Sequence, residues 1–600
     1  MRLLCASTFL LALPAFSRLL TSISELDDLK YDFVVIGGGT AGSVLANRLS
    51  EDGRHKVLVV EAGVDNANIQ DIIVPFLGPG AFNSLVDWNF TSIPQTEMFN
   101  RTIPLPRGFV LGGSSSINFM TWNRGSDDVW DNFARLSNDS GWSWDSVSRL
   151  TPPSDGHNTT GEVIPSAHGN GPVLTSLSGF ATELDPIVSG TARSIGGRFK
   201  YNEDPNAGDM IGTSFVQNSI GHGARSSAAT AYLVPILHRP NLDVVIHSRV
   251  TKVRASYPAQ NDIPTIDTVE IAHSATGPRI EVTASREIIL SAGVFGTAQL
   301  LMLSGVGPKE ELEKRHIPVV VDSPDVGKHL VDHPLLANYF VVNSNTSFER
   351  VLRNGSIAED LLGQWEANRT GLMVDPAAGN TAAFLKNPAD LFPKFDPSSG
   401  PKSANIEMIF CNGFEPLGPT SLPSNGSFMT VITAVVSPTS RMNLFSFISD
   451  NFSDVFIGGT LTLNSTNPFD SPVIDPRLYS TEFDIQTMVQ AMKDVDTFVS
   501  ESAWEGYIVR PFVEFSNDEE RAIYARNNSI TVNHSVGTAR MGPGDGTDGV
   551  VDSSLRVKGV NGLRIVDASV YPQIPENHPQ AVAYILAERA SDLIRSCHFE

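Results

Sequence analysis

The sequence has few cysteines and fewer basic than acidic residues. It has only one long apolar stretch, which lies at the N-terminus. Its 3 cysteines among 600 residues are too few for a disulfide scaffold or a cysteine-rich zinc site. Lys and Arg total 43 against 66 Asp and Glu, so the formal net charge is −23. This balance argues against nucleic acid or an anionic membrane surface as a partner, because neutralising phosphates takes clustered basic side chains. With 41% hydrophobic residues, the chain has the composition of a globular protein.

The N-terminal stretch predicts a secretory signal peptide over residues 1–22. Arg2 precedes the apolar run 3–13, and small residues follow around Ala15 and Ser17. The alternative is a membrane anchor, but the run is shorter than the ~20 apolar residues that a spanning helix needs. We therefore expect a secreted, extracellular protein that has no membrane contact after cleavage.

Secretion bears on two other residue types. Cleavage would remove Cys5 and leave Cys411 and Cys597, and the sequence does not say whether these two pair. Asn-x-Ser/Thr sequons occur along the whole chain, so we expect many of them to carry glycans in a eukaryotic host.

The residues that follow the signal carry the pattern of a βαβ unit. Residues 31–36 form a β-branched run that stops at glycines, residues 41–49 favour a helix, and residues 56–61 form a second apolar run that ends in an acid. A βαβ unit implies a buried parallel sheet.

The rest of the chain is less regular and shows no internal repeat. Its patterns predict a loop at 151–171, strands within 242–253 and 268–290, a helix at 296–304, a segment rich in Pro, Gly and Asn that wraps the surface at 386–428, an amphipathic helix at 482–500, a strand at 563–567 and a final helix at 580–596.

A GxGxxG turn joins the first strand to the first helix, and it consists of Gly37, Gly39, Thr40, Ala41 and Gly42 with one further glycine. The first glycine permits the tight bend, the second lets the backbone approach a pyrophosphate, and the third lets the helix pack against the strand. The helix N-terminus would offer free N–H groups to the phosphates, and Glu61 suits an acceptor for ribose hydroxyls. The turn predicts a dinucleotide site without separating FAD from NAD.

Two further segments separate these cofactors. Residues 107–118, a second glycine–serine loop, and residues 293–307 resemble the two patterns of the glucose–methanol–choline (GMC) oxidoreductases, which are flavoenzymes. The resemblance extends over residues 31–594. Fungal aryl-alcohol oxidases are most similar within that family, in stretches such as 562–567, and pyranose dehydrogenases share many of the same stretches.

The resemblance implies an α/β fold with a Rossmann-like FAD-binding domain on a parallel sheet, interleaved with a substrate domain of antiparallel sheet plus helices. The expected order is FAD-binding domain at 30–100, FAD loop and substrate domain at 101–214, FAD-binding domain at 215–335, substrate domain at 336–530, and a C-terminal FAD-binding part with the catalytic histidines at 531–600.

The resemblance also implies FAD as the cofactor. We expect noncovalent binding, because Ile117 stands where some relatives have the histidine that links to the flavin. Besides the glycine turn and Glu61, the residues that match cofactor-binding positions are Arg107, Gly113, Ser114, Asn118, Val250, Asp567 and Ala568.

Oxidation of an alcohol needs a base for the hydroxyl proton, and a neutral imidazole suits that task near neutral pH. Two of the 13 histidines stand out by context. His534 lies in a segment that resembles the family's catalytic segment, and we predict that it is the general base. His578 lies at the family's second active-site position, where it would hydrogen-bond the substrate hydroxyl and the developing alkoxide.

Phe119, Phe414 and Asn533 are predicted to line the substrate pocket. Aryl-alcohol oxidases have Tyr where this chain has Phe119, Phe where it has Asn533, and Pro where it has Ser535. Asn533 would make the pocket wider and more polar, and a pocket position would leave its sequon without a glycan. Phe414 would supply another wall.

His329 and His333 have the i, i+4 spacing of metal ligands on a helix. Leu330 replaces the Glu of the zinc-protease motif, and residues 326–333 match a structural stretch of the family. We therefore expect no metal.

Together these features predict a monomeric, secreted, FAD-dependent alcohol oxidase. It would oxidise primary benzylic or allylic alcohols to aldehydes, passing the proton to His534 and the hydride to flavin N5, with O2 reduced to H2O2. The alternatives are a sugar dehydrogenase that passes electrons to quinones, a secreted flavin-binding protein without turnover, and an intracellular NAD dehydrogenase, which conflicts with the signal peptide.

Overall fold

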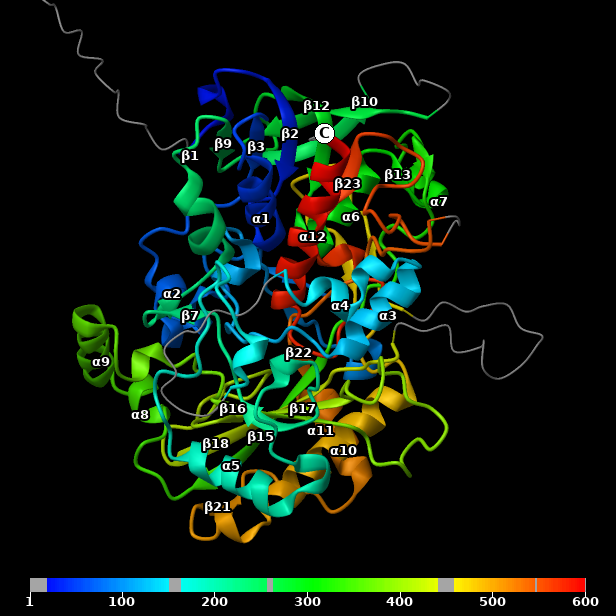
Figure 1. Ribbon diagram of the computed structural model, residues 1–600. Helices are drawn as coiled ribbons and strands as arrows, with labels where there is room; N and C mark the ends of the chain where they lie inside the picture. Colours follow the sequence, from blue (N-terminus) through cyan, green and yellow to red (C-terminus); the bar gives the residue numbers. More distant parts are fainter. Residues whose placement is uncertain (1–18, 151–162, 256–262, 441–457, 545–547, 599–600) are drawn as a thin grey trace, which may run out of the picture.

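The computed structural model describes residues 19–150, 163–255, 263–440, 458–544 and 548–598 (Figure 1). These residues fold around two large β-sheets, one in the upper and one in the lower half of Figure 1. The fold is mixed α/β, as the sequence predicts. The apolar run of the predicted signal peptide and part of the predicted loop 151–171 lie outside the described residues. The boundaries of the interleaved domain segments stay a prediction.

The first sheet has eight strands in the order β1-β9-β3-β2-β12-β11-β10, and β23 also pairs with β12. Their bounds are β1 Leu19–Leu20, β2 Lys30–Ile36, β3 Val57–Val60, β9 Leu242–Val245, β10 Arg249–Ala255, β11 Ile266–Ala272, β12 Ile280–Leu290 and β23 Leu563–Ile565. The pairs from β1 to β12 and the β12–β23 pair are parallel, whereas β11 runs antiparallel to both of its neighbours. The predicted βαβ unit is confirmed as β2, α1 (Thr40–Leu49) and β3.

β2 lies inside this sheet because it is apolar without interruption from Phe33 to Ile36, as a strand buried on both faces must be. α1 packs on the sheet and against α12 (Gln580–His598), the last helix of the described chain. Arg48 of α1 donates two hydrogen bonds of 2.8 Å to Glu588 of α12. The N-terminal and C-terminal parts of the chain therefore build one half of the molecule.

The second sheet is antiparallel, in the order β21-β15-β18-β17-β16-β6, and β22 also pairs with β15. Its strands are β6 Gly212–Phe215, β15 Pro334–Val342, β16 Thr381–Leu385, β17 Ile406–Cys411, β18 Ser427–Val435, β21 Ile508–Pro511 and β22 Ile530–Thr531. α5 (Leu184–Ile195) and α10 (Glu482–Val499) share a buried core with one face of this sheet.

The prediction for residues 386–428 is wrong in part. β17, at 406–411, pairs with β16 and β18 inside the second sheet, and all six of its residues are buried. The residues rich in Pro, Gly and Asn form the turns on either side of β17. Their composition led to the prediction of a surface segment, although an apolar hexapeptide lies between them. This error matters because β17 carries a residue of the candidate site.

The remaining elements are short or lie around the two sheets. The helices are α2 Gln70–Ile73, α3 Asp127–Ser137, α4 Trp144–Val147, α6 Gly293–Leu303, α7 Lys309–Lys314, α8 Glu349–Leu352, α9 Gly355–Asn368 and α11 Asp518–Asn528. The strand pairs are β4 Phe90–Thr91 with β5 Pro104–Leu105, β7 Ile220–Gly221 with β8 Ala224–Arg225, β13 Val306–Gly307 with β14 Val321–Asp322, and β19 Thr460–Thr462 with β20 Val473–Asp475. The predicted helices at 296–304, 482–500 and 580–596 are confirmed as α6, α10 and α12.

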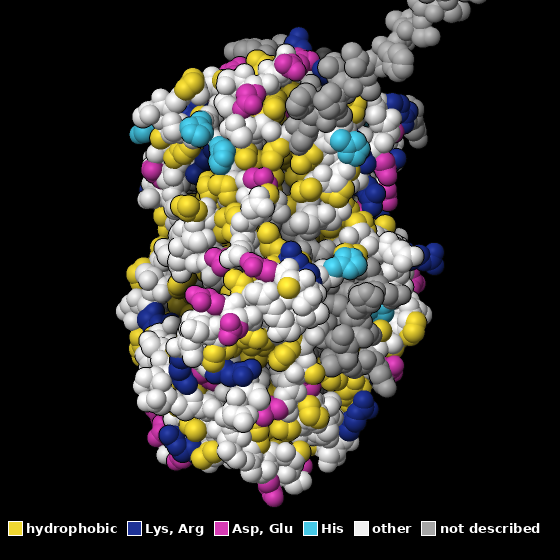
Figure 2. All heavy atoms as spheres, turned by 90° about the vertical axis from the view of Figure 1, so that its left-hand side faces the viewer, with side chains coloured by type: hydrophobic (Ala, Val, Ile, Leu, Met, Phe, Trp, Pro, Cys, Tyr) yellow, Lys and Arg dark blue, Asp and Glu magenta, His cyan; other side chains and the backbone are white. Residues whose placement is uncertain are grey.

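The surface and the cysteines agree with the composition. Acidic and basic side chains are interspersed over the face shown in Figure 2. Cys411 is buried, Cys597 is exposed, and both are free thiols. Among the described residues, no helix combines the length and the apolarity that crossing a membrane takes.

Two carboxyl groups near the second sheet have raised pKa values. Burial raises the pKa of Asp375 to about 7, and the nearby Asp185 adds to the shift. Burial raises the pKa of Glu415 to about 8, with further contributions from Asp375 and Glu349. A carboxyl whose pKa is higher in the folded than in the unfolded state binds its proton more tightly when folded. Its contribution to stability is therefore present in acid and is lost as the pH rises through the folded pKa.

We expect the unfolding temperature to be highest in mildly acidic buffer and to fall as the pH rises from about 5 to about 8. Asp375→Asn removes one of the raised carboxyls, so thermal unfolding of this variant should depend less steeply on pH. The same change at the exposed Asp390 is the control. An unchanged pH slope in Asp375→Asn would contradict this account.

Candidate active site

A cavity of about 310 Å³ lies at the carboxyl ends of β2, β3 and β12, where a doubly wound sheet binds its ligands. The predicted residues that line it are Gly37, Gly39, Thr40, Ala41, Glu61, Arg107, Gly113, Ser114, Asn118, Phe119, Val250, Asn533, His534, Asp567, Ala568 and His578. Segments from five parts of the chain therefore meet around one cavity. Two of the predicted site residues, Gly42 and Phe414, do not line this cavity.

Gly42 acts beneath the cavity, in the turn itself. A Cβ atom on Gly42 would lie 1.9 Å from the carbonyl oxygen of Gly37, and one on Gly37 would lie 2.3 Å from that of Ser291 at the end of β12. Gly37 also has φ +103°, which side chains rarely adopt. The turn can form here only because these residues lack side chains.

The second glycine loop packs directly on the first. A Cβ atom on Gly113 would come within 2.8 Å of the Cα of Gly39, and the N–H of Gly112 donates a 2.8 Å hydrogen bond to the carbonyl of Gly38. Gly39 is the N-cap of α1 and has no side chain over the first N–H groups of the helix. Two bare backbone segments and a helix N-terminus thus form a cradle that suits the pyrophosphate of a dinucleotide.

Glu61 supports this cradle from below. Its two carboxylate oxygens accept hydrogen bonds of 2.7 Å from the N–H groups of Gly38 and Gly63. Burial raises the pKa of Glu61 to about 7, although these hydrogen bonds act in the opposite direction. Glu61 therefore holds the glycine turn in place and also lines the cavity, and its role as an acceptor for ribose hydroxyls stays a prediction.

Asp567 ties the C-terminal segment to the start of α6. Its carboxylate accepts hydrogen bonds from the N–H of Gly293 at 3.0 Å and from the hydroxyl of Thr297 at 2.6 Å. Its other oxygen accepts a 2.8 Å hydrogen bond from the N–H of Ser569, and burial raises its pKa. This network places residues 567 and 568 beside the cradle.

Arg107 and Asn118 belong to the second loop. Nη1 of Arg107 donates to the Pro106 carbonyl at 2.7 Å, and its guanidinium lies 4.9 Å from the centre of the Phe295 ring. Nη2 of Arg107 is buried and has no hydrogen-bond partner within the described part of the chain, and burial lowers the pKa of this guanidinium. An unpaired buried donor that faces the cavity fits a polar ligand such as a flavin dinucleotide. Asn118 donates to Gln580 of α12 at 2.8 Å.

The pairing of β15 with β22 brings two histidines together. Pro334 lies opposite Thr531 in this antiparallel pair, so His333 and His534, just outside the two strands, come side by side. Their Nδ1 atoms are 3.0 Å apart. The N–H groups of both residues donate 2.8 Å hydrogen bonds to Asp332, which is buried. Nδ1 of His534 is thereby occupied, and Nε2 is the nitrogen available to a substrate.

The surroundings of His534 favour its neutral form. Burial lowers its pKa well below 6.5, and the nearby His578, His333 and Arg107 lower it further, because each disfavours a second positive charge. A lowered pKa favours the unprotonated imidazole, which is the state that a general base requires.

His578 lies against the other side of His534, with ring centres 4.6 Å apart and planes at 74°. Nε2 of His578 is 2.8 Å from a carboxylate oxygen of Glu407, which is buried in β17. Glu407 was not predicted as a site residue, because residues 386–428 were predicted to lie on the surface. A single carboxylate within the apolar run 406–411 was the signal that could have revealed it, since a buried charge needs a partner.

His329 and His333 do not form a metal site. They do not lie on a helix, and His329 has φ +61° and contacts Asp325 at 3.2 Å. Within the described ranges, no group of three His, Cys, Asp or Glu side chains is arranged to hold a metal ion. His333 instead contacts the candidate base, a role that its sequence context did not reveal.

Two of the three residues predicted to line the substrate pocket line the cavity, and the third lies elsewhere. Phe119 faces the cavity and packs edge-on against Phe82 at 5.6 Å, and Asn533 also lines the cavity. Phe414 instead stacks on Tyr339 at 4.2 Å in a separate core.

A cradle for a dinucleotide with two imidazoles beside it is typical of an oxidoreductase that uses a bound dinucleotide. Two family models, both described as GMC oxidoreductase, match residues 31–335 and 458–587. The chain belongs to the GMC oxidoreductase family, and it is a FAD-dependent oxidoreductase.

Relatives and solved structures agree with this assignment. The chain is 35% identical to dehydrogenase eriK of Hericium erinaceus, over 99% of each sequence, and 34% identical to pyranose dehydrogenase 3 of Leucoagaricus meleagris, over 94% and 93%. A structure of formate oxidase from Aspergillus oryzae RIB40, solved in a study of FAD modification, has a TM-score of 0.85 at 28% identity and covers 96% of this chain and 99% of its own. A fungal aryl-alcohol oxidase shares the fold, with a TM-score of 0.79 at 24% identity over 96% and 100%.

Gly42→Ala should abolish FAD binding, because its methyl group would collide with the backbone of Gly37 and displace the turn. The ratio of flavin to protein absorbance in the purified variant measures this. Gly190→Ala is the matched control, because Gly190 lies in α5 with open space around it. A Gly42→Ala protein with a full complement of flavin would show that the turn does not hold the cofactor.

Proposed function

We propose that this GMC oxidoreductase is an alcohol oxidase that converts primary aryl or allylic alcohols to aldehydes, with O2 reduced to H2O2. The observation that carries the proposal is the position of His534, which is held between His333 and His578 and faces the cavity next to the cofactor cradle.

The histidines have distinct tasks in this proposal. Nε2 of His534 accepts the proton of the substrate hydroxyl, while His333 and Asp332 hold the ring and backbone of that residue in place. His578 hydrogen-bonds the substrate oxygen. The carboxylate of Glu407 holds the His578 ring in place as negative charge develops on that oxygen. Bound FAD supplies the two-electron acceptor for the carbon-bound hydride.

The cofactor is proposed to be noncovalent. Ile117 is a buried, unreactive side chain in the second glycine loop, at the position that matches the flavin-linking histidine of some relatives. Trichloroacetic acid should therefore release all of the flavin into the supernatant.

Secretion, glycosylation and a monomeric state complete the proposal. Cleavage of the signal after Ser17 suits the structure better than cleavage at 22. It leaves β1 (Leu19–Leu20) in its parallel pairing with β9, whereas cleavage at 22 would remove this edge strand. N-terminal sequencing of the secreted protein distinguishes these two sites.

A second candidate function is a sugar dehydrogenase that reduces quinones. One observation favours it. Asn533 presents a polar group to the cavity and accepts a 3.2 Å hydrogen bond from Thr531, which leaves its amide NH2 group to donate to a polyhydroxylated substrate. The similarity to pyranose dehydrogenase 3 supports the same alternative.

His534→Ala should lower kcat by about 10²–10⁴ for every alcohol that the protein oxidises, because general-base catalysis contributes about that much. The purified protein is to be assayed on benzylic, allylic and sugar alcohols, with O2 and with a benzoquinone as acceptors. Retained flavin absorbance in the variant controls for misfolding. A loss of less than tenfold would rule out His534 as the base. A wild-type protein that binds flavin but oxidises none of these alcohols would instead support the flavin-binding protein without turnover.

The acceptor separates the two catalytic candidates. An oxidase releases one H2O2 for each aldehyde, and its flavin returns to the oxidised spectrum within seconds of mixing with air. A reduced spectrum that persists for minutes in air would contradict the oxidase and support the dehydrogenase.

Asn533→Gly tests the substrate class without straining the backbone, because residue 533 has φ +65°, which glycine tolerates. Benzyl alcohol does not need the amide, so its kcat/KM should stay within about twofold. A sugar held by that amide would lose up to about tenfold, the equivalent of one neutral hydrogen bond. Asn68→Gly, at φ +61° on an exposed turn, is the control. A tenfold loss for benzyl alcohol alone would contradict the aryl-alcohol proposal.

A further inference from the structure

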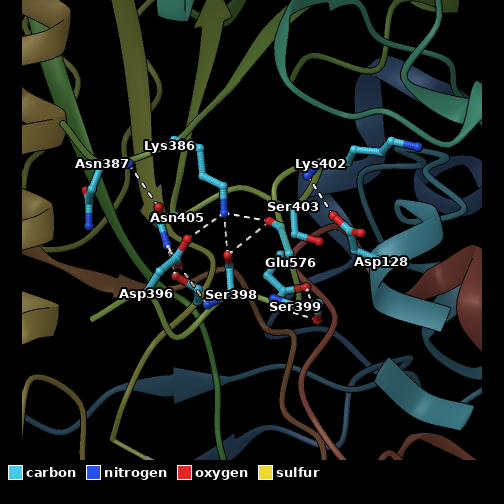
Figure 3. Close-up of polar contacts among 12 residues, drawn as sticks. Asp128, Lys386, Asn387, Asp396, Ser398, Ser399, Lys402, Ser403, Asn405 and Glu576 are labelled. Atoms are coloured by element: carbon cyan, nitrogen blue, oxygen red, sulfur yellow. Dashed lines mark hydrogen bonds and ion pairs between the residues drawn. The ribbon is translucent and has the colours of Figure 1, made fainter. Parts of the chain in front are cut away.

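The connection between β16 and β17, residues 386–405, reaches from the second sheet to the segment that carries His578. Figure 3 shows its side chains converging around Lys386 and meeting Glu576 of the C-terminal segment. A second cavity, of about 550 Å³, lies beside this connection. None of these contacts is part of the cofactor cradle or touches the substrate end of the first cavity.

Lys386 organises the connection. Its Nζ donates hydrogen bonds to the Asp396 carboxylate at 2.8 Å, the Ser398 hydroxyl at 2.5 Å and the Gly400 carbonyl at 2.6 Å. Burial alone would raise the pKa of Asp396, but the hydrogen bonds from Lys386 and Asn405 hold it below its ordinary value. An ammonium group has three donors, and all three are used here. The second cavity thus offers no open cation to an anionic ligand at Lys386, and its polar groups brace the loop.

Ser399 connects the ordered loop to Glu576, which is fully buried. The N–H of Ser399 donates to the Glu576 carboxylate at 2.9 Å, and its hydroxyl lies 3.0 Å from both carboxylate oxygens. Gln573 donates a further hydrogen bond of 2.9 Å. A buried carboxylate is costly without donors, so Glu576 depends on the conformation that places Ser399.

His578 lies two residues after Glu576. Its Nε2 contacts the carboxylate of Glu407, the second residue of β17. Glu407, which contacts the His578 ring, and Glu576, which lies two residues before it, therefore both depend on one connection, which presents Ser399 to Glu576 and then leads directly into β17. We propose that Lys386, Ser399 and Glu576 are positioning residues that set the His578 ring against the substrate.

The far end of the same connection supplies an internal comparison. Nζ of Lys402 contacts Asp127 at 2.5 Å. The backbone N–H of Lys402 donates to Asp128 at 2.6 Å (Figure 3), and both acids lie at the start of α3. This ion pair fastens the connection to α3 without touching Glu576 or β17. Loss of the Lys402 side chain removes only the ion pair to α3, whereas loss of the Lys386 side chain disorders the part of the loop that holds Glu576.

The test compares Lys386→Met, Ser399→Ala and Glu576→Ala with the control Lys402→Met, in the FAD-loaded protein. The three variants should lower kcat about tenfold and leave KM within about twofold, because displacing an oriented group by a fraction of an ångström slows the reacting step more than binding. Hydrogen–deuterium exchange should rise in residues 573–580 and stay unchanged in residues 37–61. Lys402→Met should match the wild type in kcat and in exchange of 573–580.

Glu576→Gln separates positioning from charge, since the amide carbonyl still accepts from Ser399, and it should recover most of the kcat lost in Glu576→Ala. Equal losses in Lys402→Met and Lys386→Met, or unchanged exchange of 573–580 in Glu576→Ala, would overturn the proposal. The kinetic part rests on the proposed alcohol oxidation. The exchange experiment needs no turnover, so it decides the positioning role even if no alcohol proves to be a substrate.

Discussion

The contact between His578 and Glu407 joins the two halves of this protein at the point where its chemistry is expected. Glu407 is a carboxylate inside an antiparallel sheet, and burying such a group without a partner is strongly unfavourable. Its partner comes from the segment that leads into α12, a helix of the other half. This buried pair therefore ties the second sheet to the segment that carries His578.

The two halves contribute different kinds of groups to the site. The first half supplies backbone: the glycine turn, the loop that packs on it and the bare N-terminus of α1, with Glu61 as a buried support. The second half supplies His333 and His534 through the register of β15 with β22, and Glu407 at the start of β17. A neutral base next to a hydrogen-bonding imidazole results from this division, because His534 is enclosed by groups that disfavour its positive form.

Local signals in the sequence predicted the elements that carry their own pattern. The βαβ unit, α6, α10 and α12 were all found from periodicity and glycine spacing, because such signals depend on residues close together in the chain. β17 escaped prediction because its six buried residues lie between turn-rich segments, and a short apolar run has the same appearance in a strand, a helix or a buried loop. Because β17 was not predicted, Glu407 was not predicted either, and Phe414 was expected to line the pocket although it packs in a separate core.

The amino-acid sequence by itself determined the cofactor turn, the family and the two histidines, since each is recognised from residues within one short segment. Only the tertiary structure decided that His333 contacts the base, that Glu407 supports His578 and that Phe414 belongs to a separate core. These relations join positions up to about two hundred residues apart, such as His333 and His534, which are 201 residues apart. They depend on strand register and on the pairing of buried charges, and neither is encoded in any local pattern.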